Sequence, residues 1–221
     1  EEIGALIEKD QVLSAKVLRL ANSPFYGFPS RIASVAHAVV VLGLNVVKGL
    51  TLCATAFDMM RNAGMNELWR HSLGVAMTAH ILGTKAAMKN PEEVFVAGLL
   101  HDIGKVVLYV KWPDVGQQIT TVTRNTSRPL MDTEQELFEV THADVGGWLA
   151  SAWHLPTSLR EPILHHHTPA AAQDAKLQTA IVHVADVLVK GLACGNPGDN
   201  LVPPLSRQAW DLVGLDAQSL A

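Results

Sequence analysis

Ala97-Gly98-Leu99-Leu100-His101-Asp102-Ile103-Gly104-Lys105 is the stretch of this chain that decides its fold. The residues that lead into it, 94–100, are apolar on every side, which predicts a helix buried all round. His101 and Asp102 end this run, and a buried imidazole beside a buried carboxylate is unfavourable unless each is paired. Hydrogen bonds or a metal ion could supply the pairing. The spacing does not choose between them, because adjacent helical residues point about 100° apart.

Other ionisable residues lie on apolar helical faces and favour the metal. The face that runs from Leu68 to Leu82 contains His71, so this imidazole is expected to point toward the core. Imidazole and carboxylate donors together suit first-row ions such as Fe, Mn or Zn. The same pattern holds further along the chain for His142, for the run His165-His166-His167, and for Asp186.

The composition bounds the class of protein. A length of 221 residues with 48% hydrophobic residues permits one large domain or two small ones with a substantial core. The net charge of −4 argues against a general nucleic-acid-binding surface. No apolar stretch is long and clean enough to span a membrane, and no signal peptide is visible. The two cysteines, Cys53 and Cys194, lie among small or apolar residues, so we expect a reducing, cytoplasmic compartment without disulfides.

Apolar residues recur at helical spacing and no segment alternates convincingly with period two, so we predict an all-α protein. Asp10 and Ser34 stand where helix caps are expected, and Gly43, Pro91 and Pro156 mark helix ends. The expected helices cover residues 3–8, 11–21, 35–42, 45–60, 66–89, 92–109, 113–125, 132–153 (bent near residue 142), 156–165, 173–192 and 206–213.

Two further expectations concern individual segments. Residues 35–52 have a helix–Gly–helix pattern that looks like a helix-turn-helix, but Arg and Lys are too sparse there for DNA phosphate contacts. The apolar neighbours of Trp69, Trp148 and Trp153 place these three side chains in the core.

The order of the ionisable residues resembles the HD superfamily of metal-dependent phosphohydrolases, and the motifs are more similar to its HDOD branch, the HD-related output domain. The early segment Val17–Gly27, with Asn22-Ser23-Pro24-Phe25-Tyr26, is typical of HDOD domains and not of catalytic HD enzymes. The resemblance covers roughly residues 1–192. The other segments that carry it are Leu68–Ser72, Ala97–Lys105, His142–Gly146, Trp153–Pro156, His166–Pro169 and Ala185–Leu188.

The resemblance implies an HD-domain-like helical bundle with an additional N-terminal helical lobe. We expect this lobe at residues 1–60, the HD-like core at residues 61–195, and a C-terminal loop and short helix at residues 196–221. In the HD family, the His-Asp pair, the first His and the last Asp surround one ion. Families that keep the extra histidines hold two ions, with the Asp as a bridge.

The ligand set implied here has seven members, too many for a single four-coordinate zinc ion. We therefore expect one or two divalent ions, Fe, Mn or Zn, with Asp102 and Lys105 as the catalytic residues if the chain is an enzyme. Lys105 would bind a phosphate, and His183 is expected to support Asp186 through a hydrogen bond. The seven expected ligands are His71, His101, Asp102, His142, His166, His167 and Asp186.

The remaining histidines are expected to lie outside the ligand set. His37, His80 and His154 are interpreted as ordinary structural histidines, and His165 as a residue beside the site or exposed.

The chain departs from one enzymatic relative. Cyclic-dinucleotide phosphodiesterases of the HD-GYP type continue after their His-His pair with an acidic residue and an Asp-Gly-x-Gly-Tyr-Pro loop, whereas here Thr168-Pro169-Ala170 follows. Two functions stay open. The favoured one is a bacterial-type signal transduction module that binds a partner protein or a small phosphorylated ligand. The alternative is a metal-dependent phosphohydrolase acting on a nucleotide, a cyclic dinucleotide or another phosphate ester. No nucleic-acid or membrane partner is expected, and the oligomeric state is left open.

Overall fold

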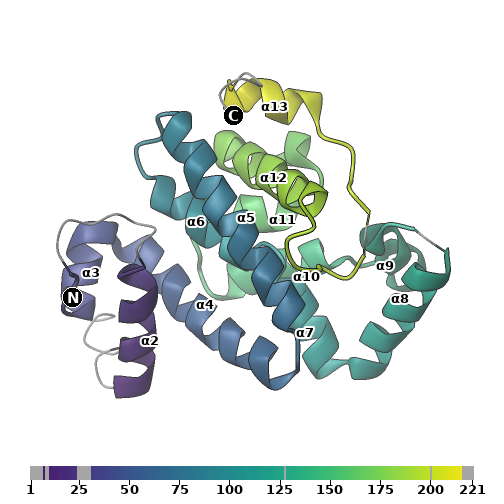
Figure 1. The fold of residues 1–221 in the computed structure, drawn as a ribbon, viewed down its shortest axis with the longest axis horizontal. Helices are drawn as coiled ribbons and strands as arrows, with labels where there is room; N and C mark the ends of the chain where they lie inside the picture. Colours follow the sequence, from purple (N-terminus) through teal and green to yellow (C-terminus); the bar gives the residue numbers. More distant parts are fainter. Residues whose placement is uncertain (1–6, 8–9, 24–30, 127, 200, 216–221) are drawn as a thin grey trace.

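The computed structural model describes residues 7, 10–23, 31–126, 128–199 and 201–215 of the chain. Within these ranges the regular elements are all helices, so the all-α prediction is confirmed (Figure 1). None of these helices combines the length and apolarity needed to cross a bilayer. The α-helices are α2 (Gln11–Ala21), α3 (Val35–Leu42), α4 (Leu44–Asn62), α5 (Asn66–Lys85), α6 (Pro91–Leu100), α7 (Ile103–Lys111), α8 (Pro113–Thr126), α9 (Leu130–Phe138), α10 (His142–Ala152), α11 (Thr157–His165), α12 (Lys176–Gly191) and α13 (Arg207–Val213).

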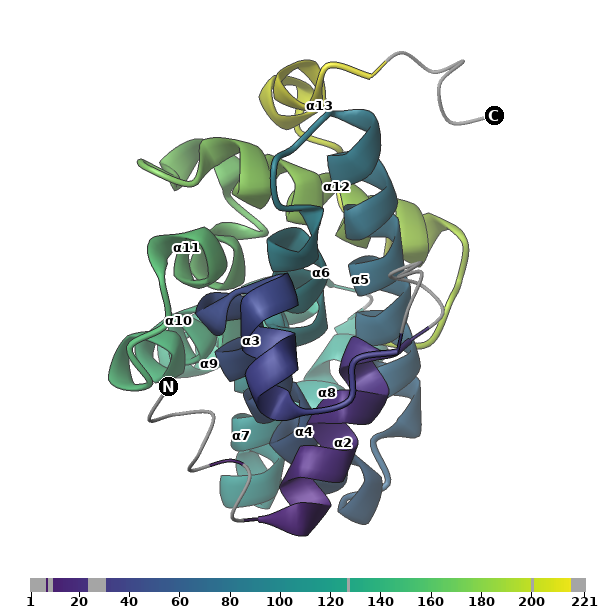
Figure 2. The same ribbon diagram turned by 90° about the vertical axis from the view of Figure 1, so that its left-hand side faces the viewer.

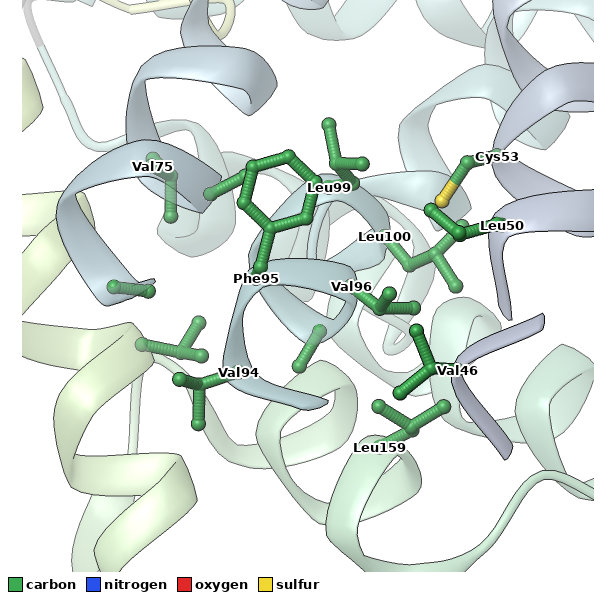
Figure 3. Packing of buried hydrophobic residues seen from close by; sticks show 14 of the residues in the cluster. Val46, Leu50, Cys53, Val75, Val94, Phe95, Val96, Leu99, Leu100 and Leu159 are labelled. Atoms are coloured by element: carbon green, nitrogen blue, oxygen red, sulfur yellow. The ribbon is translucent and has the colours of Figure 1, made fainter. Parts of the chain in front are cut away.

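Helix α6 forms the centre of the bundle, as its apolar sequence predicts. Every residue from Val94 to Leu100 is buried, and α6 contacts α4, α5, α11 and α12. Figure 3 shows Val96 of α6 beside Val46 of α4 and Leu159 of α11, with Val75 of α5 on the other side. A helix enclosed by four others has no solvent face, which explains why its sequence shows no polar stripe.

The helices α2, α3 and α4 pack against one another, and α4 carries this group onto α6. Asp10 caps α2 by accepting hydrogen bonds of 3.0 Å from the backbone N–H groups of Val12 and Leu13. Ser34 caps α3 by accepting from the backbone N–H of His37 at 3.0 Å. Figure 2 shows α13 at the top of the molecule, α2 at the bottom, and α3 between them on the side that faces the viewer. The predicted helix at residues 3–8 lies almost wholly outside the described residues.

The single helix predicted at residues 92–109 is wrong, because the chain turns at His101 and Asp102 and continues as α7. The backbone N–H of Lys105 bonds the carbonyl of Asp102 at 3.0 Å as α7 begins. The turn brings α7 against α10 at Gly104, where an added Cβ would lie 1.9 Å from the carbonyl oxygen of His142. Only glycine allows two helix starts to approach this closely.

The predicted helix at residues 132–153 is likewise two helices. Glu139 adopts a left-handed conformation (φ 57°) and ends α9, and Thr141 then starts α10 with a capping box. In that box, the Asp144 side chain accepts a hydrogen bond from the backbone N–H of Thr141 at 2.9 Å, and the Thr141 hydroxyl accepts one from the backbone N–H of Asp144 at 3.2 Å. The break turns the start of α10, and His142 with it, into the interior.

The tryptophan prediction is wrong for two of three residues. Trp148 is 60% exposed and Trp153 is 37% exposed, whereas Trp69 packs on the core beside Phe57 with ring centroids 4.6 Å apart. Helix α10 buries its glycine side instead. A Cβ at Gly146 or Gly147 would lie within 2.8 Å of α11 side chains, so small residues form that contact and Trp148 faces outward.

After α12 the chain crosses back over the start of α5. Gly195 adopts φ +73°, and a Cβ there would lie 2.4 Å from the backbone nitrogen of His71. The backbone N–H of Asn196 bonds the carbonyl of Glu67 at 3.1 Å. Asp199 then accepts a hydrogen bond from the backbone N–H of Leu130 at 2.8 Å, so this segment ties α5 to α9.

Candidate metal centre

The fold brings all seven predicted ligand residues to one place in the interior. They come from the body of α5, the turn between α6 and α7, the first residue of α10, the two residues directly after α11, and the middle of α12. Six of them are at most 1% exposed, and His167 is half-buried. The seven, in chain order, are His71, His101, Asp102, His142, His166, His167 and Asp186.

One group of donors forms around Asp186. The His71 Nε2 atom lies 3.0 Å from Asp186 Oδ1, and the His101 Nε2 atom lies 3.9 Å from the same oxygen. The Asp102 Oδ2 atom completes the group, 3.3 Å from His101 Nε2 and 3.9 Å from His71 Nε2. Ligand atoms of His71, His101 and Asp102 all lie within 4.8 Å of one another, a spacing that a single ion can bridge.

A second group consists of the three histidines from α10 and the end of α11. The Nε2 atoms of His142 and His167 are 2.9 Å apart, and ligand atoms of His142, His166 and His167 lie within 4.8 Å of one another. Two imidazole nitrogens at this distance repel each other unless a proton or a cation lies between them. This group can also hold an ion.

Asp102 lies between the two groups and presents one oxygen to each. Its Oδ2 atom faces His101 and His71, whereas its Oδ1 atom lies 3.3 Å from His142 Nε2 and 3.8 Å from His166 Nε2. A carboxylate in this position can be shared by two cations. With Asp102 shared, three further donors remain on each side, so each side has four.

Several of these atoms have no hydrogen-bond partner, although they are buried. Among the described residues, this is true of the Nε2 atoms of His71, His101 and His166, and of the Oδ1 atoms of Asp102 and Asp186. The 3.0 Å contact between His71 and Asp186 is not aligned as a hydrogen bond. An unpaired buried polar group costs about 1–3 kcal/mol, and five around one point indicate a partner that is not part of the chain.

Hydrogen bonds outside the cluster fix which imidazole nitrogen faces the centre. The Nδ1 atom of His101 bonds the carbonyl of Gly98 at 2.7 Å, and that of His166 bonds the carbonyl of Ile163 at 2.9 Å. A carbonyl only accepts, so each Nδ1 carries a proton, and in the neutral imidazole Nε2 keeps its lone pair. Those lone pairs face the centre, as metal-binding histidines require.

The charges of the cluster fit the same role. Burial lowers the pKa of His166 and His167 well below the usual range, and nearby imidazoles lower it further, which keeps both neutral. Burial lowers the pKa of His101, but the carboxylates of Asp102 and Asp186 raise it above the usual value, so a metal ion bound there would displace a proton. Burial opposes ionisation of Asp102, but the positive charges of His101 and Lys105 hold the pKa of its carboxyl well below the usual range. Neutral imidazoles and an ionised carboxylate are the forms that coordinate metals.

Glu134 is part of the site and was not predicted. It lies on α9, is completely buried, and accepts hydrogen bonds from the backbone N–H of His142 at 2.9 Å and from His142 Nδ1 at 2.6 Å. It therefore orients His142 as the carbonyls orient His101 and His166. A sequence signal existed, since Glu134 lies four residues after Leu130 on the buried side of α9.

The predicted bond from His183 to Asp186 is wrong. The Nδ1 atom of His183 bonds the carbonyl of His166 at 2.7 Å, and its Nε2 atom accepts from the backbone N–H of Ser206 at 3.0 Å. One helical turn separates His183 from Asp186, but the imidazole is directed at α11 instead. His183 thus holds the backbone of His166 and the start of α13.

Lys105 is almost fully buried, at 2% exposure, and its ammonium lies 2.8 Å from Asp102 Oδ2. Burial would lower the pKa of Lys105, but the carboxylate of Asp102 raises it above the usual value, so the amine stays charged. The same side chain lines a cavity of about 690 Å³ that opens beside the centre. Lys105 therefore joins the cluster to a space large enough for a small molecule.

Comparisons with known proteins bear on the family and the fold of the chain. Residues 1–169 match the family model of the HDOD domain. A solved structure described as an HDOD domain protein of unknown function from Geobacter sulfurreducens is 30% identical, with a TM-score of 0.73 over 96% of this chain and 74% of that one.

Two more distant structures share the fold. A candidate phosphohydrolase from Shewanella amazonensis is 22% identical, with a TM-score of 0.65 over 99% of this chain and 84% of that one. A candidate signal transduction protein from Marinobacter aquaeolei is 21% identical, with a TM-score of 0.70 over 98% of this chain and 49% of that one. An uncharacterized protein of Treponema pallidum is 26% identical over 206 residues, and the chain spans 40% of its length.

Proposed function

The chain belongs to the HDOD domain family, and we propose that it is a signal transduction module built on a centre of two divalent metal ions. The proposal rests on one observation: five buried nitrogen and oxygen atoms in the cluster around Asp102 have no hydrogen-bond partner. Nitrogen and carboxylate oxygen donors in this mixture suit Fe, Mn or Zn.

The proposed ligands divide at Asp102. His71, His101 and Asp186 would hold one ion and His142, His166 and His167 the other, with Asp102 as the shared ligand. This division uses the two groups of donor atoms and gives each ion four protein donors. Hydrogen bonds from the outer atoms of His101, His142 and His166 hold three of these imidazoles in place before any ion binds.

The regulatory role rests on what lies beside the centre. The Gly-Tyr-Pro-type loop of the cyclic-dinucleotide enzymes is replaced by Thr168 and a short 3₁₀ helix, Pro169–Ala171. The metal centre would therefore bind a small phosphorylated ligand, or order the helices around it, and a partner protein would sense the result.

Metal binding is the first test. The chain is purified, stripped with a chelator, and titrated with Mn²⁺, Fe²⁺ or Zn²⁺ while heat and bound metal are measured. We expect two ions per chain, and far weaker binding in Asp102→Asn, because that change removes the negative charge common to both sites. His154→Asn is the matched control, since His154 is exposed and its left-handed backbone (φ 51°) suits Asn. A stripped chain that binds no ion at millimolar concentration contradicts the proposal.

A metal-dependent phosphohydrolase is the second candidate, and Lys105 favours it. Its ammonium lies 2.8 Å from Asp102 Oδ2 and its side chain lines the 690 Å³ cavity, so a phosphate in the cavity would lie near both Lys105 and the cluster. Two bound ions supply an activated water and positive charge for a phosphoryl oxygen. Asp102 and Lys105 would then be the residues on which turnover depends.

An activity assay separates the two candidates. The metal-loaded chain is incubated with phosphate monoesters, diesters and cyclic dinucleotides, and released phosphate or nucleotide is measured beside Asp102→Ala. We expect little or no turnover of cyclic dinucleotides, since misplacing a substrate by about an ångström can lower the rate on the order of a hundredfold. Robust hydrolysis that disappears in Asp102→Ala would make the chain an enzyme.

A further inference from the structure

Lys190 lies beside the candidate metal centre and has no part in the proposed function. It stands one helical turn after Asp186 on α12, and its side chain is only 7% exposed. Its ammonium nitrogen lies 3.8 Å from Asp186 Oδ2 and 4.0 Å from Asp199 Oδ1. Lysine is almost never fully buried without a charged partner, so these two carboxylates account for its position.

The two oxygens of Asp186 face different partners. The Oδ1 atom lies 3.0 Å from His71 Nε2 and 3.9 Å from His101 Nε2, and it has no hydrogen-bond partner. The Oδ2 atom is the one that lies near Lys190. Lys190 therefore pairs with the oxygen that the ligand cluster leaves over, and an ion held by Oδ1 would act on the same carboxylate as this ammonium.

Asp102, the other aspartate of the cluster, also has a buried lysine one turn later, but the contact is different. Lys105 donates a hydrogen bond of 2.8 Å to Asp102 Oδ2. Lys190 lies at ion-pair distance from two carboxylates and at hydrogen-bond distance from neither. Lys105 is thus bound to one acceptor, whereas Lys190 has two acceptors at nearly equal distance.

Asp199 is the second acceptor, and the backbone holds it in place. Its side chain is 8% exposed, and it accepts hydrogen bonds from the backbone N–H groups of Leu130 and Leu201 at 2.8 and 3.2 Å. Leu130 is the first residue of α9. Lys190 therefore lies between a carboxylate that faces the metal centre and a carboxylate that is fixed to the start of a neighbouring helix.

The ammonium of Lys190 balances charge when no ion is bound. In the metal-free chain Asp186 is a buried carboxylate, which is unfavourable unless an opposite charge lies near it. A divalent ion at Oδ1 would supply that charge and would repel the ammonium beside the other oxygen. Lys190 consequently stabilises the empty centre more than the filled one, and by thermodynamic linkage it weakens metal binding.

We propose that Lys190 is an internal counter-cation that regulates the metal centre: it pairs with Asp186 while the centre is empty and moves toward Asp199 when an ion binds. The inference rests on the proposed function and adds to it how the ions are exchanged. Because Lys190 keeps the empty chain folded and lowers the affinity for metal, the centre gains and loses ions without unfolding. The movement also carries the state of the centre to Asp199 and the start of α9.

Mn²⁺ titration and urea unfolding of Lys190→Met test this role, because the two measurements should change in opposite directions. Methionine keeps most of the length of the side chain and removes its charge. We expect the urea midpoint of the metal-free variant to fall by roughly 1–2 M, and its Mn²⁺ binding to become about tenfold tighter than that of the native chain. A residue that only fills space or orients Asp186 would weaken stability and binding together.

Three further variants complete the experiment. Lys190→Arg keeps the charge and should bind Mn²⁺ within about threefold of the native chain. Lys176→Met is the control on the same helix, since Lys176 is exposed at the start of α12, and it should change neither measurement. Asp199→Asn removes the carboxylate that receives Lys190 and should weaken Mn²⁺ binding about threefold.

Two results would overturn the inference: Mn²⁺ binding by Lys190→Met that is no tighter than that of the native chain, or an unchanged urea midpoint. Folding of this variant only with Mn²⁺ present counts as a lowered midpoint. If it does not fold at all, Asp199→Asn decides, and binding that is not weakened overturns the inference. A native chain that binds no Mn²⁺ refutes the metal centre itself, whereas native binding without a gain in Lys190→Met refutes the role of Lys190 alone.

Discussion

Two carboxylate regions of this molecule are buried to a similar degree but are satisfied in opposite ways. Glu161 of α11 is 7% exposed and accepts hydrogen bonds from the backbone N–H groups of Gln173, Asp174 and Ala175, the shortest at 2.7 Å. Asp102 and Asp186 are 1% exposed, and each keeps an oxygen without a hydrogen-bond partner. The chain itself satisfies Glu161, whereas the cluster around Asp102 is complete only with something added.

The difference separates a structural role from a functional one. Glu161 holds the loop that leads into α12, and nothing beyond the chain is needed there. Around Asp102, neighbouring hydrogen bonds orient the ligands but leave their inner atoms free, so stability is given up for binding. Changes in the two regions should therefore respond differently to metal.

The largest expected effect is the increase in the free energy of unfolding when metal binds. A saturating ion that binds only the folded chain should raise the free energy of unfolding by about 4 kcal/mol at a free concentration 1,000 times its Kd. Urea unfolding with and without Mn²⁺ measures this increment. The increment should disappear in Asp102→Asn and persist in Glu161→Gln. If Mn²⁺ stabilised both variants equally, Asp102 would not differ from Glu161 in binding metal.

The second largest effect on stability is expected at the contact between α7 and α10, beside the candidate metal centre. Gly104→Ala would place a Cβ 1.9 Å from the carbonyl oxygen of His142, so α7 and α10 must separate, at roughly 3 kcal/mol. Metal affinity should fall as well, because His142 moves. Gly191→Ala is the control, with no atom within 4 Å of the added Cβ. Normal stability and normal metal binding in Gly104→Ala would show that the close approach is unimportant.

Glu161→Gln should lower the free energy of unfolding by about 2 kcal/mol, since a charged acceptor of three backbone hydrogen bonds becomes neutral. Urea unfolding without metal gives the number. Glu136→Gln on the surface is the matched control and should change stability by less than about 0.5 kcal/mol. If the two substitutions cost the same, the backbone hydrogen bonds to Glu161 contribute little.

The smallest expected effect is the pH dependence of the stability that Glu161 contributes. Burial opposes ionisation of Glu161, but the N–H groups of Ala175, Asp174 and Gln173 hold the pKa of its carboxyl below the usual value of 4.5. A pKa lowered by folding stabilises the protein fully above the unfolded value, and this is lost as pH falls through the folded value. The stability difference between the native chain and Glu161→Gln should therefore be constant near neutrality and shrink below pH 4.5. A difference that grows in acid contradicts the sign.

Sequence patterns predicted the central helix and failed where the chain breaks. The apolar run 94–100 becomes α6, and Asp10 and Ser34 cap helices as expected, because such features depend on neighbours in sequence. The breaks after Leu100 and at Glu139 carry no proline at the break itself, and tertiary packing of α7 and α10 decides them.

The same distinction between local sequence and tertiary packing applies to the candidate site. Histidine and aspartate on apolar helical faces could be identified from spacing. Partners supplied by distant segments could not, because Glu134 meets His142 only after α9 and α10 separate, and His183 bonds the carbonyl of His166 rather than its helical neighbour Asp186. Trp148 was misplaced because glycines, not the indole, form the buried side of α10.

The central claim is that Asp102 is shared by two ions, and anomalous diffraction from crystals grown with Mn²⁺ tests it most directly. The account predicts two anomalous peaks on opposite sides of the Asp102 carboxylate. One should lie among His71, His101 and Asp186, and the other among His142, His166 and His167. The absence of any peak in contact with Asp102, in crystals that show Mn²⁺ elsewhere on the chain, would contradict it.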